Sequence, residues 1–313
     1  MEASSKINLS YSSHSVVVFR VKNHHMLTRK RSSVAPETDN HKCILVHHQD
    51  PFTKLGPFKI EMAYNSPMFM IIHELFTEED MSYLVSWARP RLSRTRQISN
   101  LEDDGRRPKN EWRTRKTVKT VHKSVQAWLY ERSYLDLEDP YNTSNTVYHP
   151  RPIRLARRIE RAVAMNVTKR WASVPYQVTS YGMGGLCEDH NDPYGYNGGA
   201  ELTPDRADLV YSGDIFGTLM GWLSDTSAGG ATTFFANDKP VLLWPTKGAA
   251  AFWFGLYSDG SKDGAVYHGG CPVISGSKWI LNKWINTFEQ FSKYPCSRYR
   301  KVRVQPWDKS RFW

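Results

Sequence analysis

The spacing of apolar positions indicates helices in the first half of the chain. The apolar run 68–72 predicts a strand. Thr77 and, three residues later, Asp80 have the pattern of a helix N-terminus, and apolar residues then recur at helical spacing up to Pro90, which ends the helix. A second helix is expected from Pro152, because proline suits the first turn of a helix.

The second half of the chain has the pattern of a β-structure. Short runs rich in aromatic and β-branched residues alternate with turns that contain Gly, Asp and Pro: 176–181, 218–224, 249–256, 266–268 and 279–285. Several short strands with such turns are typical of a barrel or a double-sheet jelly roll. The expected fold class is therefore α+β, with a double-stranded β-helix (jelly-roll) core and N-terminal supporting helices.

This pattern divides the chain into four parts. Residues 1–42 are rich in Ser, His, Lys and Asn without clear periodicity, and we expect a poorly ordered leader there. Residues 43–174 are expected to support the core with helices and strands, residues 175–296 to form the jelly roll, and residues 297–313 to form a basic tail. No run approaches the roughly 18 apolar residues of a membrane-spanning helix.

Composition narrows the possible functions only slightly. The chain carries 42 basic and 31 acidic residues, a net charge of +11, and 40% hydrophobic residues, which is typical of a globular protein. A basic balance permits an acidic partner, but spread-out charges usually form a solvated surface. We find no stacking platform or nucleic-acid motif and expect no nucleic-acid partner. Four cysteines are too few for a disulfide scaffold, and they contain no CxxC zinc signature.

The triplet His190-Asn191-Asp192 is a candidate metal motif. If it lies in a strand, His190 and Asp192 point to the same side and Asn191 faces away. An imidazole and a carboxylate are two legs of the facial triad that holds non-haem Fe(II), and the third leg would be another histidine. The triplet is short, and a turn before Pro193 is the alternative interpretation.

Two further residues suggest an enclosed site. His268 ends a strand-like run just before Gly269, and Lys278 follows ten residues later. This even separation allows both side chains to enter one barrel interior. A lysine buried among aromatic residues is costly unless an anion pairs with it, which points to a carboxylate ligand. The alternative is that Lys278 lies at the barrel rim in water.

Five motifs occur together in a recognisable order. They are YGMGG at 181–185, HND at 190–192, LSDTSAGGAT at 223–232, PTKGAAAFW at 245–253 and HGGCPVISGSKW at 268–279. In this order and spacing the chain, from about residue 43 to residue 296, resembles the catalytic region of the collagen-type prolyl 4-hydroxylase alpha subunits. These belong to the superfamily of dioxygenases that depend on 2-oxoglutarate and Fe(II).

The resemblance implies a reaction and residue roles. The protein would be an enzyme of the procollagen-proline 4-dioxygenase type. It would hydroxylate peptidyl proline at C4 with Fe(II), O₂ and 2-oxoglutarate and release succinate and CO₂. L-ascorbate would reduce iron oxidised in unproductive turnovers. The implied iron ligands are His190, Asp192 and His268. The implied 2-oxoglutarate-binding residues are Lys278, Tyr181, Thr232 and Trp284.

Other implications concern the substrate, the partner and the compartment. Ser124, His122 and Cys187 fall near the expected peptide groove, where His122 replaces a usual Arg and Cys187 a usual Tyr. The resemblance also implies a Cys271–Cys296 disulfide, protein disulfide isomerase as a beta subunit, and the endoplasmic reticulum lumen, although we see no signal-peptide core. Two alternatives stay open: a 2-oxoglutarate dioxygenase with another substrate, and a non-catalytic paralogue.

Overall fold

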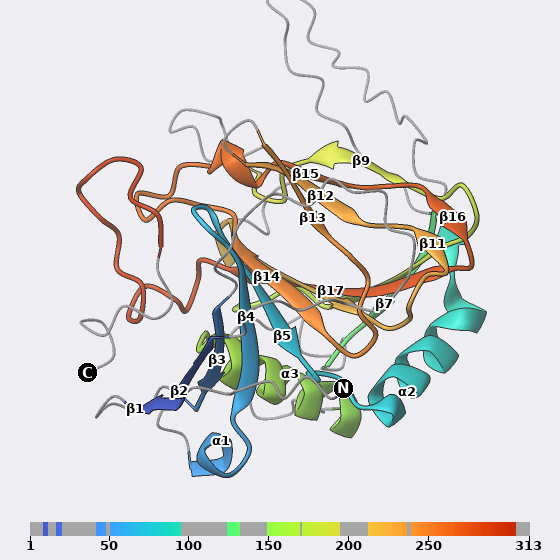
Figure 1. Cartoon of the computed structure of the whole chain (residues 1–313), viewed down its shortest axis with the longest axis horizontal. Helices are drawn as coiled ribbons and strands as arrows, with labels where there is room; N and C mark the ends of the chain where they lie inside the picture. Colours follow the sequence, from blue (N-terminus) through green and yellow to red (C-terminus); the bar gives the residue numbers. More distant parts are fainter. Residues whose placement is uncertain are drawn as a thin grey trace, which may run out of the picture.

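The described strands form three antiparallel sheets (Figure 1). The computed structural model describes residues 9–11, 17–20, 42–47, 51–94, 124–131, 149–169, 171–194, 212–236 and 239–304. The largest sheet has 11 strands in the order β1-β2-β3-β4-β5-β14-β10-β17-β8-β7-β6, the second has the order β13-β12-β15-β9, and β11 pairs with β16.

The elements have the following bounds. The large sheet contains β1 (Leu9–Tyr11), β2 (Val17–Arg20), β3 (Lys42–Val46), β4 (Phe58–Asn65), β5 (Met68–His73), β6 (Ser93–Arg94), β7 (Ser124–Leu129), β8 (Tyr176–Tyr181), β10 (Ile215–Trp222), β14 (Ala250–Phe254) and β17 (Lys278–Asn286). The small sheet contains β9 (Cys187–His190), β12 (Thr232–Ala236), β13 (Lys239–Leu243) and β15 (His268–Gly270). The remaining elements are β11 (Ala228–Gly229), β16 (Val273–Ser275), α1 (Pro51–Leu55), α2 (Glu78–Ala88) and α3 (Pro150–Val163), with the short helices η1 (Arg89–Arg91) and η4 (Gly264–Val266).

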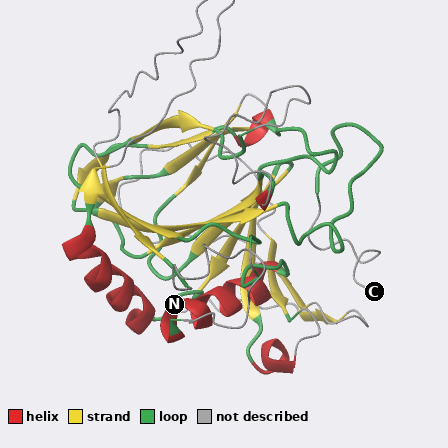
Figure 2. Ribbon diagram, turned by 180° about the vertical axis from the view of Figure 1, so that it is seen from behind, coloured by secondary structure: helices red, strands yellow, loops and turns green. Residues whose placement is uncertain are grey.

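The two faces of the large sheet are buried against different layers. Helices α2 and α3 lie on one side and the small sheet on the other (Figure 2). Side chains alternate along each strand. On β14, Ala250, Phe252 and Phe254 pack in the core under the helices, whereas Ala251 and Trp253 pack in the core between the sheets. The expected jelly-roll core with supporting helices is therefore confirmed.

The N-terminus of α2 has the capping arrangement that the sequence predicts. Thr77 Oγ1 accepts a hydrogen bond from Asp80 N at 3.1 Å, and Asp80 Oδ2 accepts one from Thr77 N at 3.3 Å. The helix ends at Ala88, and Pro90 lies in η1. Helix α3 begins at Pro150, two residues before the predicted start. The start of each helix is thus determined by local sequence signals.

A buried ion pair fixes the outer face of β17. Lys283 is 1% exposed and pairs with Glu131, which lies two residues after the end of β7. Its Nζ also donates to the carbonyl of Val174 at 2.6 Å and lies 4.4 Å from the ring centroid of Tyr176. The charge is therefore fully satisfied on the side of β17 that faces away from the small sheet.

One local prediction needs correction. The run 266–268 is not one strand, because η4 occupies Gly264–Val266 and β15 starts only at His268. The Asp263 side chain accepts from Ala265 N at 3.0 Å and thereby stabilises the helical turn. Within 1–42, β1 and β2 extend the large sheet through β3. The rest of that predicted leader, and residues 305–313 of the predicted tail, lie outside the described residues.

The described helices are all too short or too polar to cross a lipid bilayer.

The cap of α2 gives a stability test. Thr77→Ala removes the acceptor for Asp80 N and should lower the free energy of unfolding by about 1 kcal/mol. Thr77→Ser keeps the hydroxyl and should stay near the wild-type value. Urea denaturation followed by far-UV circular dichroism measures both. Equal midpoints for the two variants would show that the cap contributes nothing.

Candidate functional site

A cavity of about 300 Å³ opens between the two sheets. Its walls come from β7, β8, β10, β14 and β17 of the large sheet and from β9, β12 and β15 of the small one. Because side chains alternate along β17, Lys278, Ile280, Asn282 and Trp284 all face this cavity. One face of a single strand thus supplies four of the lining residues.

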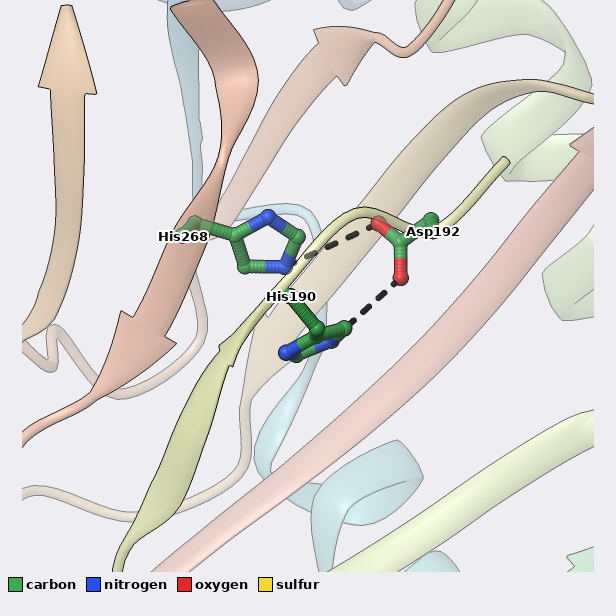
Figure 3. A group of neighbouring side chains, drawn as sticks. All are labelled: His190, Asp192 and His268. Carbon is green, nitrogen blue, oxygen red and sulfur yellow. Dashed lines mark ion pairs between the residues drawn. The ribbon is translucent and has the colours of Figure 1, made fainter. Parts of the chain in front are cut away.

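Three potential metal ligands meet on the cavity wall. Ligand atoms of His190, Asp192 and His268 all lie within 4.8 Å of one another. The Nε2 atoms of the two histidines are each 3.7 Å from an oxygen of Asp192 (Figure 3). His190 ends β9 and His268 begins β15, and the two are paired in the antiparallel register. The pairing of two strands far apart in sequence therefore brings the histidines together.

Asp192 reaches this point by a different route from the one the sequence predicts. Strand β9 ends at His190, and Asp192 lies in the bend that follows, so strand alternation does not position it. Asn191 does not face away; it also lines the cavity, and its Oδ1 is buried with no hydrogen-bond partner among the residues that the structure describes. The turn interpretation thus describes the backbone after His190, while the predicted convergence of the side chains is still observed.

Hydrogen bonds hold the Asp192 carboxylate at both oxygens. Thr218 Oγ1 donates to Oδ2 at 2.7 Å, and Trp284 Nε1 donates to Oδ1 at 3.0 Å. The side chain is 5% exposed. Although burial opposes it, the neighbouring His268 and His190 keep the pKa of Asp192 well below its usual range. The carboxylate is therefore ionised and fixed in orientation.

The histidines are oriented through their other ring nitrogens. His190 Nδ1 lies 2.8 Å from the carbonyl oxygen of Glu188, and His268 Nδ1 lies 2.9 Å from that of Val266. A carbonyl only accepts, so Nδ1 carries a proton in both rings, which leaves Nε2 as the atom that can bind a metal ion. Such outer contacts commonly fix the tautomer of metal-binding histidines.

The protonation states of the two histidines differ. Burial lowers the pKa of His268 to about 4, which favours the neutral ring. Burial also lowers the pKa of His190, but hydrogen bonds to Asp192 and Cys187 outweigh it and raise the pKa well above the usual value. A metal ion at Nε2 would replace the proton of His190. Two imidazoles and a carboxylate on one side of an open cavity fit a divalent metal ion with free coordination positions.

Lys278 lies buried in the same cavity, at the start of β17. It is 3% exposed, its Nζ is 3.3 Å from Thr232 Oγ1, and it lies 5.6 Å from the ring centroid of Tyr181. No carboxylate of the described residues forms a salt bridge with it. Burial lowers the pKa of Lys278 to about 8. A buried ammonium group without a counter-ion suits a carboxylate ligand better than an empty cavity.

The residues predicted near the peptide groove have different fates. Cys187 lines the cavity, with Sγ 3.8 Å from His190 Nδ1. Ser124 is buried on β7 opposite Tyr181 but does not line the cavity. His122 lies outside the described residues.

The disulfide implied by the resemblance does not form in the structure. Cys271 and Cys296 are both free thiols. Cys271 N donates to the carbonyl of Ala231 just before β12, whereas Ser297 N donates to that of Ser258 in the segment after β14.

The sequence analysis missed a row of side-chain amides in the cavity. Gln126, Gln177 and Asn282 lie on the adjacent strands β7, β8 and β17 and are joined by hydrogen bonds. Asn282 could have been found by extending the alternation from Lys278. The two glutamines belong to no metal or anion pattern, so nothing distinguished them from surface residues.

Comparison with known proteins gives a consistent result at the level of sequence. No protein-family model matches the chain. It is 28% identical over 254 residues to human prolyl 4-hydroxylase subunit alpha-1, covering 80% of this chain and 40% of the human protein. It is 29% identical over 257 residues to mouse prolyl 4-hydroxylase subunit alpha-3, covering 82% and 40%. The chain thus spans about two fifths of the length of these relatives.

Two prolyl hydroxylases of known structure show some likeness to the chain. The viral collagen prolyl hydroxylase of Paramecium bursaria Chlorella virus-1 is 17% identical, with a TM-score of 0.44 over 70% of this chain and 94% of that one. The Trichoplax adhaerens prolyl hydroxylase is 15% identical, with a TM-score of 0.41 over 71% and 84%. The sequence matches, not these, carry the assignment: the resemblance indicated by the motifs is confirmed, and the chain is a homologue of the prolyl 4-hydroxylase alpha subunits.

Proposed function

We propose that the chain is an Fe(II)- and 2-oxoglutarate-dependent dioxygenase that hydroxylates proline in a peptide. One observation carries the proposal: a buried lysine, with no counter-ion in the described part of the chain, shares a cavity with a His-Asp-His cluster. The cluster suits Fe(II) and the lysine suits the distal carboxylate of a keto diacid. The names of the sequence relatives support proline as the target.

Each side chain has a role in this proposal. Bound Fe(II) and 2-oxoglutarate would supply oxidative hydroxylation of a C–H bond by O₂, with succinate and CO₂ released. His190 and His268 offer Nε2 lone pairs, while Thr218 and Trp284 keep the Asp192 carboxylate in place.

At the other part of the cavity, Lys278 pairs with the distal carboxylate. The Thr232 hydroxyl lies within hydrogen-bond distance of the Lys278 ammonium group and would help to orient the distal carboxylate. Met220, Ile280 and Trp253 are buried lining residues that exclude water and thereby strengthen both interactions.

The finer parts of the proposal rest on the resemblance. They are hydroxylation at C4 of collagen-like proline, reactivation by L-ascorbate, protein disulfide isomerase as a partner and the endoplasmic reticulum lumen. The free Cys271 and Cys296 give no support for the compartment.

The experiment that tests the function separates the alternatives. Purified protein is incubated with Fe(II) and 2-oxoglutarate, with and without a panel of proline-containing peptides that includes Gly-Pro-Pro repeats. We expect succinate release that is stimulated by peptide, and a peptide product heavier by one oxygen atom. Succinate without a hydroxylated peptide would indicate another substrate. No succinate under any condition would indicate a non-catalytic paralogue.

Removal of one metal ligand should abolish turnover. His190→Ala, Asp192→Ala and His268→Ala should each reduce succinate release by more than about 100-fold, beyond what loss of an outer contact usually costs. Bound iron, measured by metal analysis, should fall in parallel. Asp189→Ala is the matched control, because this exposed acid on β9 does not line the cavity. An iron content that is unchanged in all three ligand variants would contradict the site.

Loss of the Lys278 charge should affect the co-substrate specifically. Lys278→Met keeps the apolar stem and should raise the KM for 2-oxoglutarate roughly 10- to 100-fold, the range for a charge-assisted hydrogen bond. Lys278→Arg keeps the charge and should raise it less. Initial rates of succinate release at saturating iron measure both. An unchanged KM for 2-oxoglutarate in Lys278→Met would show that Lys278 does not bind the co-substrate.

The affinity for 2-oxoglutarate should depend on pH. Since burial lowers the pKa of Lys278 to about 8 and the diacid needs the ammonium form, affinity should be constant below this pH. Above it, each pH unit should weaken binding about tenfold, until the pKa of the complex is reached. Isothermal titration calorimetry measures the profile. In Lys278→Arg the decline should vanish, and a decline that persists there would assign it to another group.

A further inference from the structure

A chain of three carboxamides crosses the cavity wall. Asn282 Nδ2 donates to Gln177 Oε1 at 2.9 Å, and Gln177 Nε2 donates to Gln126 Oε1 at 2.6 Å. Thr179 Oγ1 adds a second bond to Gln177 Oε1 at 3.3 Å. All four side chains line the cavity. We call these four residues the amide row.

The amide row lies beside the metal-binding cluster. Asn282 is two residues from Trp284 on the same face of β17, and Trp284 Nε1 donates to Asp192. From Asn282 the row continues onto β8, where Gln177 is its register partner, and then onto β7. A substrate that brings a carbon atom to the cluster therefore passes within reach of this wall.

The amide row and Lys278 offer different chemistry. Among the described residues that line the cavity, Lys278 is the one lysine or arginine. The row carries no charge, so an anionic co-substrate is drawn to Lys278 and the row remains for a neutral polar group. A main-chain amide is such a group.

The hydrogen bonds give the row a direction. The oxygen of Gln177 accepts from Asn282 and Thr179, and the oxygen of Gln126 accepts from Gln177. Among the described residues none accepts a hydrogen bond from the NH₂ group of Gln126 at the β7 end, and this group can donate two hydrogen bonds and accepts none. The row thus ends in a donor.

A donor is what a prolyl substrate needs. Proline has no backbone N–H, so the main chain at this residue offers a carbonyl oxygen and no hydrogen to donate. We propose that Gln126 is a specificity residue that donates from Nε2 to a main-chain carbonyl at or next to the target proline, and that Gln177 is the positioning residue that holds it. This inference rests on the proposed function and assigns the peptide side of the same site.

An isosteric change gives the sharpest test. Gln126→Glu keeps the shape and the oxygen that accepts from Gln177 but replaces the NH₂ group with an acceptor. Gln126→Met removes both. The substrate is a peptide that the wild-type protein hydroxylates. We expect the KM for this peptide to rise about tenfold in Gln126→Met and more in Gln126→Glu, because one hydrogen bond is lost and its partner is left unpaired. In both variants the KM for 2-oxoglutarate should rise less than the KM for peptide.

Further variants separate positioning from general damage. Gln177→Met should raise the KM for peptide less than Gln126→Met, and the double variant should be no worse than Gln126→Met alone, because the two act as one unit. Val125→Ala is the matched control: it lies next to Gln126 on β7 but does not line the cavity, and it should leave both KM values unchanged.

The outcomes decide between this inference and the proposed function. If wild-type protein hydroxylates no peptide, both fall. If it does and Gln126→Glu leaves the KM for peptide unchanged, only the role of Gln126 falls. If both KM values rise together with a lower melting temperature, the row is structural and the inference is likewise overturned.

Discussion

The alternation of side chains along β17 is the constraint on which core and site both depend. Residues two apart share a face, so Lys278, Ile280, Asn282 and Trp284 face the cavity while Leu281 and Ile285 pack in the core under the helices. A shift of one residue in the pairing with β8 or β10 would exchange the two faces. It would place Lys278 among the apolar side chains under the helices and Leu281 in the site, so the hydrophobic cores enforce the register that the chemistry needs.

Several features of the fold were predictable because their signals are local. The capping pair Thr77 and Asp80 and the aromatic run 176–181 each determine structure within a few residues. The run 266–268 was not, because the bond from Asp263 to Ala265 N turns the chain into a helix before β15. The strands β1 and β2 depend on pairing with β3, which no local pattern reveals.

The site divides in the same way. Charged and metal-binding residue types stand out in a sequence, so His190, Asp192, His268 and Lys278 could be named before their geometry was known. The hydrogen bonds that hold Asp192 come from Thr218 on β10 and Trp284 on β17, which are distant in sequence. Neither these bonds nor the bend that directs Asp192 could be predicted from the local sequence. The amide row consists of common residue types whose meaning comes only from their mutual hydrogen bonds.

The buried pair of Lys283 and Glu131 lies behind the strand that carries the site. The pair connects the outer face of β17 to the chain just beyond β7. The two strands that carry the ends of the amide row are therefore held by one ion pair. Loss of either partner would leave the other charge in the interior without its counter-ion, which destabilises the packing of these strands. A substitution at this pair would therefore reduce activity although neither residue contacts a reacting atom. Kinetic measurements alone would attribute that loss to the active site.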